Sequence, residues 1–243
     1  GSPWAPLLFP LLITLYYTGV AGWIRRCHGS RLLPGSFRQT RAFVLTLLLA
    51  PFGMALVGTG TSILTGLSPT HGFARAAALW WIGDMSGLLT VIPALMVFVA
   101  PWLSSHRASD QALIARAGIT TRLFVLACLL LLTSLTAVFL LDPSFRFQAL
   151  SLCFLPLIWI CLRHGLPGAT LAILLVTMAG LAGLPLTPGT HEQVIGFLFF
   201  VLTFAGVGLG LGSAVSRRSL AEAELASNQA RLDRVVSGAR LGL

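Results

Sequence analysis

The sequence has little charge. Only 9% of its 243 residues are charged and 56% are hydrophobic, whereas a soluble domain usually carries about 25% charged residues. The mean hydropathy is +0.89, and apolar runs of about 20 residues recur along the chain, as they do in membrane-spanning helices. This composition excludes an ordinary soluble domain. Because the runs are continuous rather than alternating, they predict a polytopic membrane protein built from helices.

Lysine is absent from the chain. All 16 basic residues are arginines, so there is no Schiff-base lysine and retinal-type chemistry is excluded. The formal net charge is +9, but the arginines lie between the apolar runs, where such residues set membrane topology. The placement of the arginines therefore predicts that the chain interacts with the lipid bilayer and does not bind nucleic acid.

Metal-binding and catalytic motifs are also missing. No Cys-x-x-Cys pair occurs, and no His/Cys cluster has metal-ligand spacing. There is no Gly-x-Ser-Gly serine with a histidine in a span, no His-Glu-x-x-His motif and no pair of acids. We therefore expect no metal, no cofactor and no enzyme activity in this chain. The four cysteines are expected to be ordinary apolar residues: Cys27, Cys128, Cys153 and Cys161.

Seven apolar segments predict seven membrane spans. The fifth and sixth are short and are joined by CLRHGLPG, which indicates either two thin spans or a helical hairpin. The predicted fold class is all-α, a polytopic transmembrane helix bundle over residues 1–215. The expected spans are 4–24, 42–66, 76–100, 119–141, 147–163, 167–184 and 194–215.

The arginines concentrate on alternate connections between the spans. The other connections carry only Arg75 and Arg146. By the positive-inside rule the Arg-rich side is cytoplasmic, so we expect the N-terminus present here to lie outside and the C-terminus inside. The Arg-rich connections hold Arg25, Arg26, Arg31, Arg38, Arg41, Arg107, Arg116, Arg122, Arg163, Arg217 and Arg218.

The chain changes character at Ser216. Residues 216–243 are polar and helix-prone, and they predict a cytoplasmic linker helix. Leu225, Asn228, Leu232 and Val235 follow a three-four spacing, which is typical of a coiled-coil seam and predicts a homodimer through this helix. The alternative is an amphipathic helix that lies on the membrane surface.

Glycines recur at a spacing of four in the seventh span. Gly206 and Gly210 form one such pair, and Gly208 and Gly212 form another. Small residues at this spacing let membrane helices approach closely. The pairs predict either a sliding or dimerising face beside the linker helix or tight packing within the bundle. Gly83 and Gly87 in the third span are assigned to the same helix-packing class.

Asp84 is the one acid that falls well inside a predicted span. A charged side chain at the centre of a membrane helix costs about 2.5–3.5 kcal/mol, so such residues usually face a partner or a water-filled cavity. Asp84 lies eight residues after Ala76, or roughly 12 Å into the outer half of the membrane. Thr59, Thr61 and Ser62 are predicted at a similar depth as hydrogen-bond partners. Asp84 is then either a polar strut between helices or the floor of a ligand pocket.

Two tryptophans precede Asp84. Trp80 is four residues before it and shares its helix face. Trp80 and Trp81 are either interfacial belt residues or the wall of a pocket for a cationic or amine-bearing ligand. Arg163, in the turn after the fifth span, is a further candidate, because it could cap a helix C-terminus or bind anionic lipid headgroups.

Several segments resemble one known family. WWIGDMSGLLTVIPALM resembles the W-W-L-G-D-x-x-G-x-L-x-x-x-P-L-x-L signature of the bacterial membrane-associated sensor domain, the first of the MASE types. GWIRRCHGSRLLPGSFRQTRAFV and FLPLIWICLRHGLPGATLAIL are similar to two further segments of that family. The resemblance spans about residues 10–215. It includes Trp80, Trp81, Gly83, Asp84, Gly87, Pro93, Arg163 and Gly165.

The resemblance implies a function. It implies a sensory input domain in the bacterial inner membrane that responds to an unknown small ligand or membrane signal. ASNQARLDRVVSGARLGL is similar to the helix that leads into a PAS domain, and members of the family precede PAS, GGDEF, EAL or histidine-kinase modules. We therefore expect the full-length protein to synthesise or degrade cyclic-di-GMP, and we expect further hydrophobic sequence before residue 1. The alternatives are the sensor of a histidine kinase and a transporter-like protein that uses Asp84 as a proton or cation site.

Overall fold

The protein is helical throughout its described part. The computed structural model describes residues 5–28, 37–66, 72–99, 125, 128–129, 132, 136, 150–183 and 191–241. These residues form helices and short turns and contain no strand. The predicted all-α fold class is confirmed.

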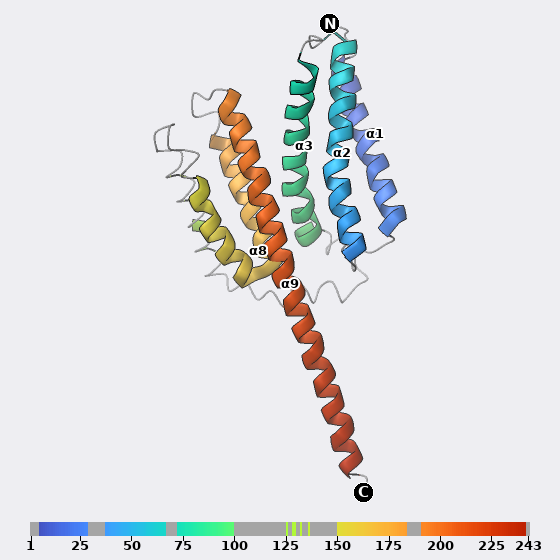
Figure 1. Cartoon of the computed structure of the whole chain (residues 1–243), viewed down its shortest axis with the longest axis vertical. Helices are drawn as coiled ribbons and strands as arrows, with labels where there is room; N and C mark the ends of the chain where they lie inside the picture. Colours follow the sequence, from blue (N-terminus) through green and yellow to red (C-terminus); the bar gives the residue numbers. More distant parts are fainter. Residues whose placement is uncertain are drawn as a thin grey trace. The chain divides into compact units, whose positions relative to one another are not determined.

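Five long helices and two short helical segments carry the described chain (Figure 1). A π-helical turn follows α3 directly, and a 3₁₀ turn precedes α8. The elements are α1 (Ala5–His28), α2 (Phe37–Leu64), α3 (Phe73–Ala94), η1 (Leu95–Val99), η2 (Ser151–Cys153), α8 (Phe154–Gly183) and α9 (His191–Leu241).

Among the described residues, four apolar stretches are long enough to cross a membrane. They are Leu45–Leu64, Phe73–Val99, Ser151–Ala182 and Gln193–Arg234, and a shorter apolar helix covers Leu8–Ile24. These stretches overlap the predicted spans except the one at 119–141, and Ser151–Ala182 covers both the fifth and the sixth. Most of the predicted span at 119–141 lies outside the described residues.

The first of two compact units comprises residues 1–96 and 187–203. Within it α1 and α3 run in the same direction and α2 runs antiparallel to both (Figure 1). Pro51 lies inside α2 and removes one N–H from its hydrogen-bond ladder. Two aromatic side chains bind carbonyls beside this proline: the Tyr16 hydroxyl donates to Ala50 O at 2.8 Å, and Trp81 Nε1 donates to Leu48 O at 3.1 Å.

The second unit comprises residues 97–186 and 204–243. Its helix α8 is interrupted at Gly165, whose φ of 61° and ψ of −143° are not helical. Such a conformation is essentially restricted to glycine. Figure 1 shows the two parts of α8 turning back on each other at this residue. The interruption falls inside the tight turn that was predicted between the fifth and sixth spans.

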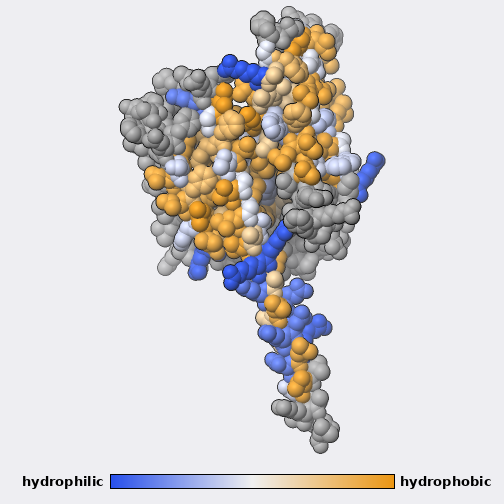
Figure 2. All heavy atoms as spheres, in the orientation of Figure 1, coloured by the Kyte–Doolittle hydropathy of each residue, from blue (hydrophilic) through white to orange (hydrophobic). Residues whose placement is uncertain are grey.

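Helix α9 continues without a break through the predicted boundary at 215/216. Its 51 residues extend over about 76 Å at 1.5 Å per residue. Most described side chains after Ser216 are exposed. Figure 2 shows mostly hydrophobic side chains on the apolar helices and both hydrophilic and hydrophobic ones along this last part of α9. One helix therefore carries both the seventh span and the predicted linker.

Candidate functional site

The Asp84 carboxylate is bound by a residue from another helix. Asp84 lies on α3, eleven residues and about 16 Å after Phe73. Its Oδ2 accepts a hydrogen bond of 2.8 Å from the hydroxyl of Tyr17 on α1, and the pair is half-buried. This bond joins α1 and α3 through two residues that are 67 positions apart in sequence. A hydrogen bond to a charged group is stronger than one between neutral groups.

Tyr17 is not the partner that the sequence predicted. The Thr61 hydroxyl donates to Val57 O of its own helix at 2.8 Å, and the buried Thr59 Oγ1 has no hydrogen-bond partner among the described residues. Ser62 is half-buried on α2. The predicted bonds from these three α2 residues to Asp84 are therefore replaced by the bond from α1. The chain has only two tyrosines, and a phenol in an apolar run needs a polar partner; this was the available signal.

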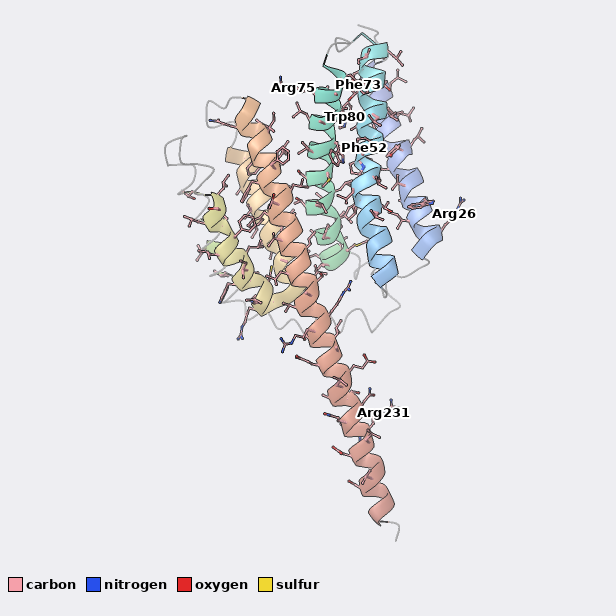
Figure 3. All side chains as sticks on the ribbon, in the orientation of Figure 1. Arg26, Phe52, Phe73, Arg75, Trp80 and Arg231 are labelled. Carbon is pink, nitrogen blue, oxygen red and sulfur yellow. The ribbon has the colours of Figure 1, made fainter. Side chains whose placement is uncertain are left out.

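Trp80 and Trp81 pack between helices. Trp80 stacks on Phe9 of α1 with ring centroids 5.9 Å apart, and it lies one helical turn before Asp84 on the same face of α3. The Trp81 ring, held by the bond to α2, meets Phe52 edge-on at 5.7 Å. Figure 3 shows Trp80 and Phe52 where α2 and α3 adjoin. The rings therefore form apolar walls of the helix group that contains Asp84.

Gly58 makes room for the Trp80 ring. A Cβ built at this position would lie 2.7–3.0 Å from three carbons of the indole, whereas a Cβ at Gly60 would meet nothing within 4 Å. We predict that Gly58→Ala destabilises the protein by about 1–3 kcal/mol through overpacking. Gly60→Ala, the matched control, should have no such penalty. Unfolding by SDS in mixed micelles, followed by loss of helical circular dichroism, measures both; equal midpoints for the two variants would refute the contact.

Two residues after Asp84, the same helix reaches α9. Ser86 is only 3% exposed, and its hydroxyl lies 2.7 Å from Ile82 O in its own helix and 3.4 Å from Leu198 O in α9. Leu198 belongs to the part of α9 that lies in the first unit. A shift of α3 at Asp84 would therefore change the contact between Ser86 and Leu198 of α9.

The predicted packing glycines fall into two groups. Gly208 and Gly212 of α9 lie against α8: a Cβ at Gly208 would meet Ile173 at 3.0 Å, and one at Gly212 would meet Ala169 at 2.7 Å. The other four face open space within 4 Å among the described residues, so the structure gives them no close helix contact there. They are Gly83, Gly87, Gly206 and Gly210.

Arg163 lies beside the interruption of α8. Its side chain is exposed, and it lies in the last turn before the chain reverses at Gly165. Its predicted roles, capping a helix C-terminus or binding anionic lipid headgroups, stay predictions. The Nε2 atom of His164 is buried and has no hydrogen-bond partner among the described residues. A buried polar atom without a hydrogen-bond partner usually lowers the stability of the fold by about 1–3 kcal/mol. The turn at Gly165 therefore carries an energetic cost.

The described residues offer no metal site. No group of three or more His, Cys, Asp or Glu residues comes together within the part of the chain that the structure describes. Cys153 and Cys161 are fully buried thiols on η2 and α8. What the arrangement around Asp84 provides instead is one carboxylate, one phenol and aromatic walls in an apolar environment, and it can respond to protonation or to a cationic group.

Comparison with known proteins identifies the family. The family model for MASE1 matches residues 2–219. This range includes every described helix except the last part of α9. No curated protein and no solved structure matches the chain. The match agrees with the resemblance found in the W-W-x-G-D segment around Asp84. The chain belongs to the MASE1 family of membrane sensory domains.

Proposed function

We propose that this domain regulates a C-terminal cytoplasmic output module that synthesises or degrades cyclic-di-GMP. The observation that carries the proposal is the hydrogen bond between Tyr17 and Asp84. It places a carboxylate between two membrane helices, on the helix that also contacts α9. A ligand or membrane state that favours one arrangement of this pair over another would shift a two-state equilibrium.

The proposed direction of signalling is inward. Arg26 and Arg75 lie at opposite ends of the first helix group (Figure 3), and the Arg26 end belongs to the Arg-rich side that the positive-inside rule assigns to the cytoplasm. On this topology in the bacterial inner membrane, α9 extends into the cytoplasm and leads toward a PAS-like domain. MASE1 domains are commonly found with cyclic-di-GMP signalling proteins, which supports this choice of output.

The proposed active form is a homodimer. Leu225 and Leu232, seven residues apart on α9, are 63% and 64% exposed, and Asn228 between them is exposed as well. Exposed leucines at a heptad spacing are stabilised when a second helix covers them. A parallel pair of α9 helices would then transmit a change of register to paired output modules.

Asp84→Asn in the full-length protein tests the proposal. The protein is reconstituted in lipid vesicles, and cyclase turnover, phosphodiesterase turnover and autophosphorylation are measured at equal amounts of folded protein. The amide removes the charge but keeps the size, and its oxygen can still accept from Tyr17. We therefore expect output to change by at least about fivefold, the difference between a charged and a neutral hydrogen bond. Thr14→Val is a control on α1, since Thr14 donates to Pro10 O of its own helix and should leave output as in the wild type.

Other outcomes separate the alternatives. Autophosphorylation without cyclic-di-GMP turnover would make this the sensor of a histidine kinase. Solute uptake into the vesicles that Asp84→Asn abolishes would identify a transporter. Output of Asp84→Asn equal to that of the wild type would contradict a sensory role for Asp84.

A further inference from the structure

Helix α8 loses a backbone hydrogen bond where it is interrupted. In a continuous helix the Leu166 N–H would donate to the carbonyl of Leu162, four residues earlier. The left-handed conformation of Gly165 turns the chain away and leaves this N–H without its helical acceptor. The second part of α8 therefore begins with a donor that must find a partner elsewhere.

The partner is a side chain of α9. The Leu166 N–H donates to Ser216 Oγ at 2.8 Å, in a part-buried position. A Cβ at Gly165 would collide with the same Ser216 Oγ, so the glycine is needed both for its backbone conformation and for this approach. Ser216 is half-buried, whereas the residues that follow it on α9 are mostly exposed. The bond thus lies near the last point where α9 rests on α8.

Apolar packing and directional polar contacts together hold α9 on α8. Gly208 and Gly212 let α8 and α9 approach closely, and the Ile173 and Leu157 side chains of α8 fit against Gly208. Phe204 of α9 also packs edge-on against Phe154 of α8 at 5.3 Å. Directional polar contacts add to this packing in setting the position of α9 along α8. They include the Ser216 bond and the contact of Cys161 Sγ with Gly208 O at 3.5 Å.

We propose that Ser216 is a latch: its hydroxyl, by accepting the Leu166 N–H, holds α9 in one register on the interrupted helix α8, and release of this bond changes the signalling output. A serine in a helix has a second option, because its hydroxyl can turn to a carbonyl of its own helix. The latch can therefore open without unfolding either helix. Its effect on output rests on the proposed function, whereas its effect on the α8–α9 contact does not.

The test uses Ser216→Ala in the full-length protein in lipid vesicles, with two readouts. Cys161 is fully buried beside Gly208, so its rate of alkylation by N-ethylmaleimide, measured by mass spectrometry, reports a shift of α9. Cys153, also fully buried, serves as the internal control. We expect the Cys161 rate and the cyclic-di-GMP turnover each to change by about fivefold, as the loss of one hydrogen bond allows, with the Cys153 rate unchanged.

Two further variants separate the hydroxyl from its volume. Ser213→Ala removes a hydroxyl that binds Gly210 O of its own helix at 2.9 Å, and it should match the wild type in both readouts. Ser216→Cys keeps the volume but offers a weak acceptor, and it should behave like Ser216→Ala.

The latch is overturned if both Ser216 variants match the wild type, or if Cys161 becomes reactive while turnover stays the same. A change with Ser216→Ala but none with Asp84→Asn would overturn the proposed role of Asp84 and keep the latch. A change with Asp84→Asn but none with Ser216→Ala would do the reverse.

Discussion

Gly212→Val is expected to lower the free energy of unfolding by about 3 kcal/mol, at the upper end of what overpacking causes. A Cβ at Gly212 would lie 2.7 Å from Ala169 Cβ, 3.0 Å from Gly165 O and 3.1 Å from Leu166 Cα. Two of these three atoms belong to the backbone, and a backbone cannot move aside as a flexible side chain can. The two helices would have to separate at the point where Ser216 binds α8.

Gly210→Val is the matched control for this prediction. Gly210 lies on the same helix, two residues earlier, but a Cβ there would meet nothing within 4 Å. Its effect should stay within about 0.5 kcal/mol, as for other substitutions without close contacts. SDS-induced unfolding in mixed micelles compares the two variants. Similar losses of stability would contradict the packing of α9 on α8 through Gly212.

Tyr17→Phe is expected to destabilise the protein by about 1–3 kcal/mol, because it leaves the Asp84 carboxylate without its donor from α1. Replacing both partners with apolar groups is different. The double variant Tyr17→Phe/Asp84→Leu lacks both the hydroxyl and the carboxylate, so neither is left without its partner. Removal of both partners of a polar pair is often nearly neutral. We therefore expect the double variant to recover most of the stability that Tyr17→Phe loses.

A double-mutant cycle measures this coupling. The free energy of unfolding is determined for the wild type, both single variants and the double variant, and the coupling term should be about 1 kcal/mol or more, as for residues in direct contact. Tyr16→Phe offers a comparison, since the neighbouring hydroxyl binds the Ala50 carbonyl instead and should show no coupling to Asp84. Additive effects of Tyr17→Phe and Asp84→Leu would contradict the interaction.

Much of the fold follows from the sequence. Apolar runs near the length of a membrane helix predicted most of the observed helices, because lipid forces the backbone to satisfy its own hydrogen bonds. The interruption of α8 falls at Gly165, inside the predicted turn CLRHGLPG. Glycine favours a reversal there, because the observed φ and ψ are essentially restricted to this residue.

The orientation of each helix could not be predicted in the same way. Gly206 and Gly208 belong to equally spaced pairs, but a step of two residues turns a helix by about 200°. One pair therefore faces α8 while the other faces open space among the described residues, although the spacing within each pair is the same. Only the neighbouring helix decides which pair packs. For the same reason the spacing of Gly83 and Gly87 could not show whether a second helix lies against them.

The partner of Asp84 was missed for a related reason. The hydroxyls on α2 were predicted because they lie at a similar depth on an adjacent helix, whereas Tyr17 comes from α1. Depth follows from counting residues along a span, but the direction in which a side chain points depends on helix rotation. Thr61 also had a local alternative, the Val57 carbonyl of its own helix, as threonines in helices often do.

The most direct test of Asp84 as part of the sensory input uses Tyr17→Phe/Asp84→Leu in the full-length protein. Its stability should be close to that of the wild type, so a change of output cannot be attributed to unfolding. The measurement is cyclic-di-GMP turnover in lipid vesicles at equal amounts of folded protein. The account predicts that turnover differs from the wild type by at least about fivefold. Wild-type turnover in this stable variant would assign the Tyr17–Asp84 pair to the scaffold and contradict a sensory role.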